Sequence, residues 1–150
     1  MFDAISWRPC ETAADLRAHF RLRREVFVVE QAVDIALEFD EADFDDATLA
    51  YVGYSGTGET VAAGRALAPE DGHIHLGRLA VARQWRGRGV GRQLVECGEH
   101  YARLKWGKLP FALSAQTHAI GFYERLGYVL VPGEPYLDAG IPHRDMIKQP

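Results

Sequence analysis

Four arginines and three glycines occur within the ten residues Arg83 to Arg92, which read RQWRGRGVGR. The formal net charge of the chain is -4, so this stretch is a local concentration of positive charge on an acidic protein. A helical hydrophobic period begins at Val90. A glycine-rich turn before a helix exposes unpaired backbone N–H groups, and arginines add fork-shaped donors. The stretch therefore predicts a phosphate site, with a solvated turn as the alternative.

The spacing of the glycines excludes two common phosphate loops. A P-loop ends in Gly-Lys followed by Ser or Thr, whereas Gly91 is followed by Arg92 and Gln93. The dinucleotide motif G-x-G-x-x-G, started at Gly87 and Gly89, would need a third glycine where Arg92 stands. The acidic net charge argues against general binding of nucleic acid. The stretch is therefore predicted to hold a different phosphate ligand.

The composition is that of one soluble globular domain covering residues 1–150, with 47% hydrophobic and 25% charged residues. No apolar stretch is long enough to cross a bilayer, and the first ten residues show no secretory pattern, so no membrane partner is expected. Cys10 and Cys97 give neither a disulfide framework nor a metal spacing. We expect two partly buried thiols in a reducing cytoplasm.

Strands and helices must alternate to position the arginine-glycine stretch. The predicted strands cover 4–8, 48–54, 60–67, 73–81, 110–116, 128–131 and 143–148. One helix follows the N-cap residue Thr12, with Leu16, Phe20, Val26 and Phe27 on its apolar face. The hairpin at 48–67 makes the sheet partly antiparallel. The order predicts an α/β (α+β) fold with a mixed, mostly antiparallel central sheet flanked by helices.

Two further helices and one loop complete the prediction. A helix from Val90 has Leu94, Cys97, Tyr101 and Leu104 on its apolar face, and Gly107 is placed to end it. A short helix covers 118–126 and stops at Gly127. The acidic segment Glu38 to Asp46, EFDEADFDD, is predicted to be a solvated loop.

Two sequence blocks resemble those of a known enzyme family. RGRGVG at 86–91 matches the Arg/Gln-x-x-Gly-x-Gly loop of the GNAT superfamily of N-acetyltransferases, and AIGFYERLGY at 119–128 resembles its second signature. The segments at 22–31 and 139–146 are similar to the bacterial ElaA-like and YjcF-like acetyltransferases. The resemblance covers nearly the whole chain. It implies the GNAT acyl-CoA N-acyltransferase fold, with acetyl-CoA as the cofactor that supplies the acetyl group.

The resemblance also implies which residues contact acetyl-CoA. Backbone N–H groups of 88–92 would hold the pyrophosphate, and the strand at 79–81 would pair with the pantetheine arm. His118 stands where many members of the family have asparagine, and an imidazole can still make one such hydrogen bond. The residues implied to bind the cofactor are Leu79, Ala80, Val81, Arg86, Gly87, Arg88, Gly89, Val90, Gly91, Arg92, His118, Phe122 and Tyr123.

Acyl transfer to an amine needs a proton acceptor, a proton donor and an oxyanion site. By resemblance, Tyr123 is the acid that protonates the departing sulfur, although an amphipathic packing role is the alternative. The base is His75, which stands where some members have glutamate, or Glu30, or water. Each residue also has an ordinary interpretation, His75 as a surface histidine and Glu30 as a helix-end carboxylate. No metal is expected, because His73 and His75 lack an evident third ligand.

The acceptor is predicted to be a primary amine of a small molecule or protein, with no nucleic-acid partner. Glu38, Asp40 and Glu41 would attract a cationic amine to the entrance. By analogy with the family, the late turn would contribute to the acceptor site through Tyr136, Asp138 and His143. A homodimer is compatible with the resemblance. The alternative function is a noncatalytic CoA-binding sensor or interaction module with the same fold.

Overall fold

A computed structural model describes residues 4–150. Residues 1–3 lie outside the described residues, although the predicted domain and the predicted absence of a secretory pattern include them. The chain forms an eight-stranded sheet in the order β1-β2-β3-β4-β5-β8-β6, and β7 pairs with β8 beside that path. Of the pairings, β4 with β5 is parallel and the others are antiparallel, which confirms the mixed, mostly antiparallel sheet. The strands are β1 Ser6–Pro9, β2 Leu49–Tyr54, β3 Thr60–Glu70, β4 His73–Val81, β5 Phe111–Gln116, β6 Val129–Leu130, β7 Tyr136–Asp138 and β8 Ile141–Lys148.

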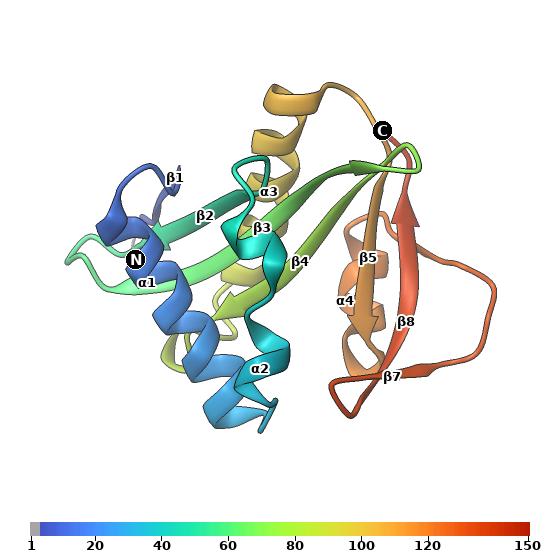
Figure 1. Cartoon of the computed structure of the whole chain (residues 1–150), viewed down its shortest axis with the longest axis horizontal. Coiled ribbons are helices and arrows are strands. Elements are labelled where there is room, and N and C mark those ends of the chain that lie inside the picture. Colours follow the sequence, from blue (N-terminus) through green and yellow to red (C-terminus); the bar gives the residue numbers. More distant parts are fainter. Residues whose placement is uncertain (1–3) are drawn as a thin grey trace.

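Helices cover both faces of this sheet. Figure 1 shows α1 and α2 in front of the strands, and α3 and α4 behind them. The helical elements are α1 Ala13–Arg23, the π-helix η1 Arg24–Glu30, α2 Ile35–Glu38, the 3-10 turns η2 Glu41–Phe44, η3 Arg83–Trp85 and η4 Thr117–Ala119, α3 Val90–Trp106 and α4 Ile120–Arg125. The predicted helix ends hold for α3, where Gly107 follows the last turn with φ +85°.

The first helix begins as predicted, and its buried side also carries polar residues that the predicted apolar face did not include. The hydroxyl of Thr12 accepts a hydrogen bond from the backbone N–H of Asp15, which caps α1. The predicted apolar face is wrong at Leu16, which is exposed. The polar residues on the buried side are His19 and Arg23, and each finds polar partners inside the protein. The helical period also changes where α1 passes into the π-helix η1.

Helix α3 packs closely on the sheet, and this closeness decides which residues it buries. Val90 and Leu94 are buried as predicted, whereas Leu104 is 73% exposed and its prediction is wrong. The hydroxyl of Tyr51 donates to the Leu94 carbonyl at 2.6 Å, and a Cβ at Gly98 would stand 2.3 Å from that hydroxyl. Glycine is therefore needed where the helix crosses β2, which hydrophobic periodicity alone does not indicate.

The acidic segment is a solvated loop only in part: Glu41, Asp45 and Asp46 are exposed, whereas the prediction is wrong for Glu38, Asp40 and Asp43. Glu38 is 3% exposed and accepts from Arg23 Nε at 2.9 Å. Asp43 accepts from Arg23 Nη1 at 2.7 Å and from Arg65 Nη1 at 2.9 Å. Arg65 also binds Asp40 at 2.7 Å. Buried charges of opposite sign pair with each other, so these three acidic residues fold inward onto arginines of α1 and β3.

His19 lies within this charged network, and it is expected to make stability depend on pH. Burial is the main reason that the pKa of His19 falls from 6.5 to about 4. Between these values the unfolded chain binds a proton that the folded protein does not, so stability falls as pH drops from about 6.5 to about 4. The loss approaches ~3 kcal/mol at the lower end. Urea unfolding at pH 7 and pH 4.5 checks this; a His19→Gln variant with an equally steep pH dependence would assign the effect to other groups.

Candidate functional site

The candidate site lies where β4 and β5 separate. The two parallel strands pair only at Ile74 with Phe111 and His75 with Ala112. Beyond that point they diverge toward the bottom of Figure 1. The edge of β4 that faces the gap, residues 76–81, is not paired with β5. A strand edge of this kind presents backbone N–H and C=O groups to a ligand that enters the gap.

A β-bulge turns β4 at the start of the gap. Ala63 pairs with Ala80 and Arg65 with Gly77, so two residues of β4 lie opposite one residue of β3. One of the two, Arg78, has φ +50°, a left-handed conformation that is uncommon outside glycine. Its guanidinium Nε donates to the Glu38 carbonyl at 3.1 Å. This bond joins the bulge to α2 and builds one wall of the site.

A pocket of ≈ 400 Å³ occupies the gap. Its apolar lining comes from Val26, Phe27, Val33, Leu37, Leu76, Leu79, Val81, Leu113, Ala119, Ala139 and Ile141. Its polar lining comes from Gln31, Glu38, Arg78, Arg86, Ser114, Gln116, His118, Tyr123, Asp138 and His143. The lining is therefore mixed, and such a concave site with convergent polar groups can orient a small molecule.

Tyr123 enters the pocket from α4. Its ring packs edge-on against Phe122 and Tyr128, with centroids 5.0 Å and 6.0 Å away. Burial raises the pKa of Tyr123 to about 12, so the hydroxyl keeps its proton near neutral pH. Within residues 4–150 no side chain or backbone group forms a hydrogen bond with this hydroxyl. Tyr123 is therefore placed as a proton or hydrogen-bond donor to a ligand.

The glycine loop has the backbone geometry of a phosphate cradle. Gly87 and Gly89 have φ +76° and +78°, and Gly89 is the N-cap residue of α3. Over the described part of the chain, the backbone N–H groups of 87–92 have no hydrogen-bond acceptor. Gly91 differs from the other two, because a Cβ there would stand 3.3 Å from Phe122 Cζ. Gly87 and Gly89 shape the loop, whereas Gly91 lets α3 approach α4.

The arginines of the loop already have protein partners. Arg86 binds both oxygens of Glu30, at 2.9 Å and 3.1 Å, and donates from Nε to the Val81 carbonyl at 3.1 Å. The guanidinium of Arg88 lies 4.9 Å from the Trp85 ring centroid. Arg92 pairs with Glu96 on the next turn of α3, at 2.8 Å. The unpaired backbone N–H groups are therefore the main feature of the loop that invites an anion.

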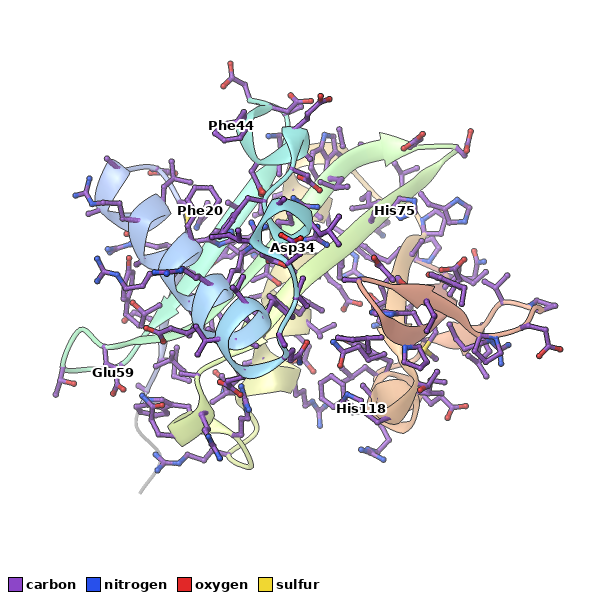
Figure 2. The ribbon with its side chains drawn as sticks, turned by 60° about the horizontal axis from the view of Figure 1, so that its bottom comes forward. Phe20, Asp34, Phe44, Glu59, His75 and His118 are labelled. Atoms are coloured by element: carbon purple, nitrogen blue, oxygen red, sulfur yellow. The ribbon has the colours of Figure 1, made fainter. Side chains whose placement is uncertain are left out.

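The structure does not bring either predicted base into the pocket. Glu30 lies outside the lining, and its carboxylate is occupied by Arg86. His75 is exposed at the end of β4 that still pairs with β5, before the gap begins. Figure 2 shows His75 well separated from His118, which does line the pocket. Both bases were predicted from their positions in the sequence. Sequence position alone does not show which side chains line the gap between β4 and β5.

Predicted cofactor residues fall into three groups in space. The pocket lining contains Leu79, Val81, Arg86, His118 and Tyr123. Ala80 belongs to the hydrophobic core, and Phe122 packs against that core. The third group is the loop at 87–92, which lies beyond the pocket lining and next to Arg86. The pocket and the loop thus meet at Arg86.

The late turn reaches the pocket in part. Asp138 and His143 line it, as the resemblance implied. Tyr136 lies outside the lining and stacks on the His143 ring, with centroids 6.2 Å apart. Glu38 also lines the pocket, but its carboxylate is bound by Arg23. Glu38 and Asp40 are thus paired with arginines of the protein, whereas Glu41 is exposed outside the pocket lining.

Sequence reasoning missed a polar chain across the pocket. Gln116 donates from Nε2 to Gln31 Oε1 at 2.9 Å, and His118 Nε2 lies 2.7 Å from Gln116 Oε1. The amide oxygen can only accept, so His118 Nε2 carries the hydrogen. Gln31 and Gln116 are 85 positions apart and meet only because η1 lies opposite the end of β5. No signal in the sequence connects them.

Two further expectations concern cysteines and metals. Cys10 and Cys97 are free and half-buried, as predicted. Burial raises the pKa of the Cys10 thiol to about 12, which makes it a poor nucleophile. From residue 4 to residue 150, no three His, Cys, Asp or Glu side chains gather in a way that could hold a metal ion. In the same residues no helix has the length and apolar character needed to cross a membrane.

Comparisons with known proteins agree with this architecture. The acetyltransferase (GNAT) domain family matches residues 15–150. A Bacillus subtilis protein named uncharacterized N-acetyltransferase YjcF is 38% identical over 133 residues, which are 89% of this chain and 91% of that protein. The crystal structure of an acyl-CoA N-acyltransferase from Pseudomonas aeruginosa has a TM-score of 0.87 and 34% identity, over 97% of this chain and 99% of that one. Escherichia coli ElaA has a TM-score of 0.85 and 30% identity, over 97% and 100%.

Proposed function

The chain belongs to the GNAT acetyltransferase family, and we propose that it transfers the acetyl group of acetyl-CoA to a primary amine. The acceptor is a small molecule or a protein, and it attacks directly in a ternary complex. One observation carries the proposal. The pocket in the β4–β5 gap contains Tyr123 and ends at Arg86, where the unpaired N–H groups of the glycine loop begin.

The residues of the donor side fit an acyl-CoA. The backbone N–H groups of 87–92 suit a pyrophosphate, because they converge at a helix N-terminus. The open edge of β4 suits the amides of a pantetheine arm, which can pair with it as a strand would. When bound, acetyl-CoA supplies an activated thioester. The apolar part of the lining offers the acyl group an environment with less water than the open solvent.

Two elements of the chain act on the reacting atoms in this proposal. Tyr123 holds its proton at Oη and offers it to the departing sulfur. The bulge at Arg78 turns the backbone of β4, so that an N–H group near Val81 can face the acyl oxygen. Both elements belong to the rigid sheet or to a helix packed on it, which favours a fixed geometry for attack.

The proposal predicts that acetyl-CoA stabilises the protein against heat. At a concentration 100 times its Kd, the gain is ~2.7 kcal/mol, which corresponds to a rise of roughly 5–10 °C in Tm for a domain of this size. Differential scanning fluorimetry with acetyl-CoA, CoA and pantetheine measures it. Pantetheine is the control and should stabilise less, because it lacks the pyrophosphate that the glycine loop would bind.

The same experiment separates the proposal from its alternative. No shift with millimolar acetyl-CoA or CoA would remove the donor assignment. A clear shift, with no release of free thiol over a broad panel of primary amines, would instead favour the noncatalytic CoA-binding sensor. Release of thiol that depends on the amine supports the transferase.

A further inference from the structure

His143 is a buried imidazole that faces the pocket from β8. It pairs with Gln116 of β5 on one side and with Tyr136 of β7 on the other. The residue is 8% exposed, and it lines the pocket that also contains Tyr123. The pocket is thus lined by an imidazole on β8 and by a phenol on α4. Strand β8 pairs with β5, and α4 packs behind β5.

The hydrogen bonds of His143 show which ring nitrogen is available. Nδ1 lies 2.6 Å from the backbone carbonyl oxygen of Ile141. A carbonyl can only accept, so Nδ1 carries a hydrogen and the neutral ring has its lone pair on Nε2. No described residue forms a hydrogen bond with Nε2. In residues 4–150 the only buried side-chain nitrogen or oxygen without a partner is Arg65 Nε, so Nε2 is not sealed inside the protein, and the residue that carries it lines the pocket.

The ring is also held in place. It stacks on Tyr136 with an interplanar angle of 23°. The Tyr136 hydroxyl donates to Asp145 Oδ1 at 2.5 Å and is hydrogen-bonded to Ser114 on β5. The hydrogen bond from Nδ1 and the stacking on Tyr136 already fix the orientation of the ring. Little further conformational entropy is therefore lost when Nε2 accepts a proton.

The surroundings leave Nε2 without a fixed ionic partner. Ionisable groups on the elements around the ring are Asp145 on its own strand, Tyr136 and Asp138 on β7, His118 on η4, and Glu38 and Arg78 across the pocket. Asp145 is engaged with Tyr136, and Glu38 is engaged with Arg23. The predicted bases differ on this point, because Glu30 is bound by Arg86 and His75 lies outside the pocket.

We propose that His143 is the general base, and that its Nε2 takes the proton from the acceptor amine. The inference rests on the proposed function. A proton passes from the ammonium to Nε2, the amine nitrogen bonds to the acyl carbon, and the carbon–sulfur bond breaks with its electron pair on sulfur. Sulfur takes a proton from Tyr123 Oη, and the second proton lost by the nitrogen replaces it on Tyr123 through water. His143 then releases its proton to solvent, so one ammonium and one thioester give one amide, one thiol and one proton.

The test is a pH–rate profile of His143→Asn. Asparagine keeps a side-chain N–H that can bond to the Ile141 carbonyl, and it removes the Nε2 lone pair. The assay follows thiol release from acetyl-CoA with a panel of primary amines, including ethanolamine and Nα-acetyl-lysine amide, from pH 6 to pH 9.5. His100→Asn on the exposed side of α3 is the matched control.

We expect kcat/KM of His143→Asn to fall about 100-fold or more at pH 7, with the KM of acetyl-CoA unchanged. The deficit should shrink toward high pH, because the amine then loses its proton to water. Added imidazole should raise the rate of His143→Ala and leave wild type unchanged. A purely structural role would not produce either response.

Two results would overturn the assignment. The first is a His143→Asn variant within about three-fold of wild type at pH 7. The second is a low-pH limb of the profile that persists in His143→Asn and disappears in His118→Asn, which would move the base to the other imidazole of the pocket. Wild type that binds acetyl-CoA but acetylates none of the amines would instead contradict the proposed function, and the base with it.

Discussion

Replacing Tyr123 with phenylalanine is expected to lower kcat about 100-fold, while the Kd of acetyl-CoA stays within about two-fold of wild type. The substitution removes one hydroxyl and keeps the ring that packs against Phe122 and Tyr128. The pKa of about 12 keeps the phenol protonated, yet it lies above the ~8.5 of a thiol. Because proton transfer from this phenol to a thiolate is uphill, the hydrogen bond from Tyr123 first strengthens as negative charge develops on sulfur, and the proton moves only as the carbon–sulfur bond breaks and a proton from the amine replaces it.

Steady-state kinetics and isothermal titration with acetyl-CoA measure the two quantities separately. Tyr101→Phe is the matched control, because this half-buried tyrosine of α3 lies outside the pocket. An unchanged kcat in Tyr123→Phe would assign Tyr123 to packing. A parallel loss of acetyl-CoA affinity would show that the hydroxyl contributes to binding of the donor rather than to the departure of sulfur.

Replacing Arg23 with methionine is expected to lower the free energy of unfolding by roughly 3–5 kcal/mol. The Arg23 side chain is fully buried and bonds to Glu38 and Asp43 at 2.9 Å and 2.7 Å. Methionine approximates the length of the arginine stem but leaves these two carboxylates without their main partner. A buried charge without a partner costs much more than the surface interactions that most substitutions remove.

Urea unfolding monitored by circular dichroism measures this loss at pH 7. Arg24→Met is the matched control, because Arg24 is the exposed next residue and should change stability by less than ~0.5 kcal/mol. The triple variant Arg23→Met, Glu38→Gln, Asp43→Asn should recover part of the loss, since it removes the stranded charges together. Equal stability of Arg23→Met and Arg24→Met would contradict the energetic role of the network.

This network also shows why the acidic segment was mispredicted. A run such as EFDEADFDD is mostly acidic and its few apolar residues show no regular period, and charge runs usually face solvent. Its fate depends on Arg23 and Arg65, which come from α1 and β3 and meet only in the folded protein. The same applies to Leu16 and Leu104, whose exposure follows from which side of each helix the sheet covers.

Local signals in the sequence were sufficient for most strands, for the ends of α3 and for the family, whereas α2 and the short strand β7 were not predicted. Gly89 and Gly107 mark the two ends of α3. A positive φ at a helix end favours glycine, and this preference is a property of the residue itself. The turn geometry of the glycine loop was also predictable, since the loop and the start of α3 are contiguous in the chain.

The resemblance pointed to Tyr123 and His143, but only the tertiary structure showed which titratable groups line one pocket. His143 and Tyr123 share a pocket because β8 pairs with β5 and α4 packs behind it, while Glu30 and His75, which the sequence favoured as bases, lie outside. The sequence by itself determined which elements form and which ligand class the glycine loop suits. Only the fold determined which titratable groups meet, because hydrogen bonds and ion pairs act over a few ångströms between residues far apart in the chain.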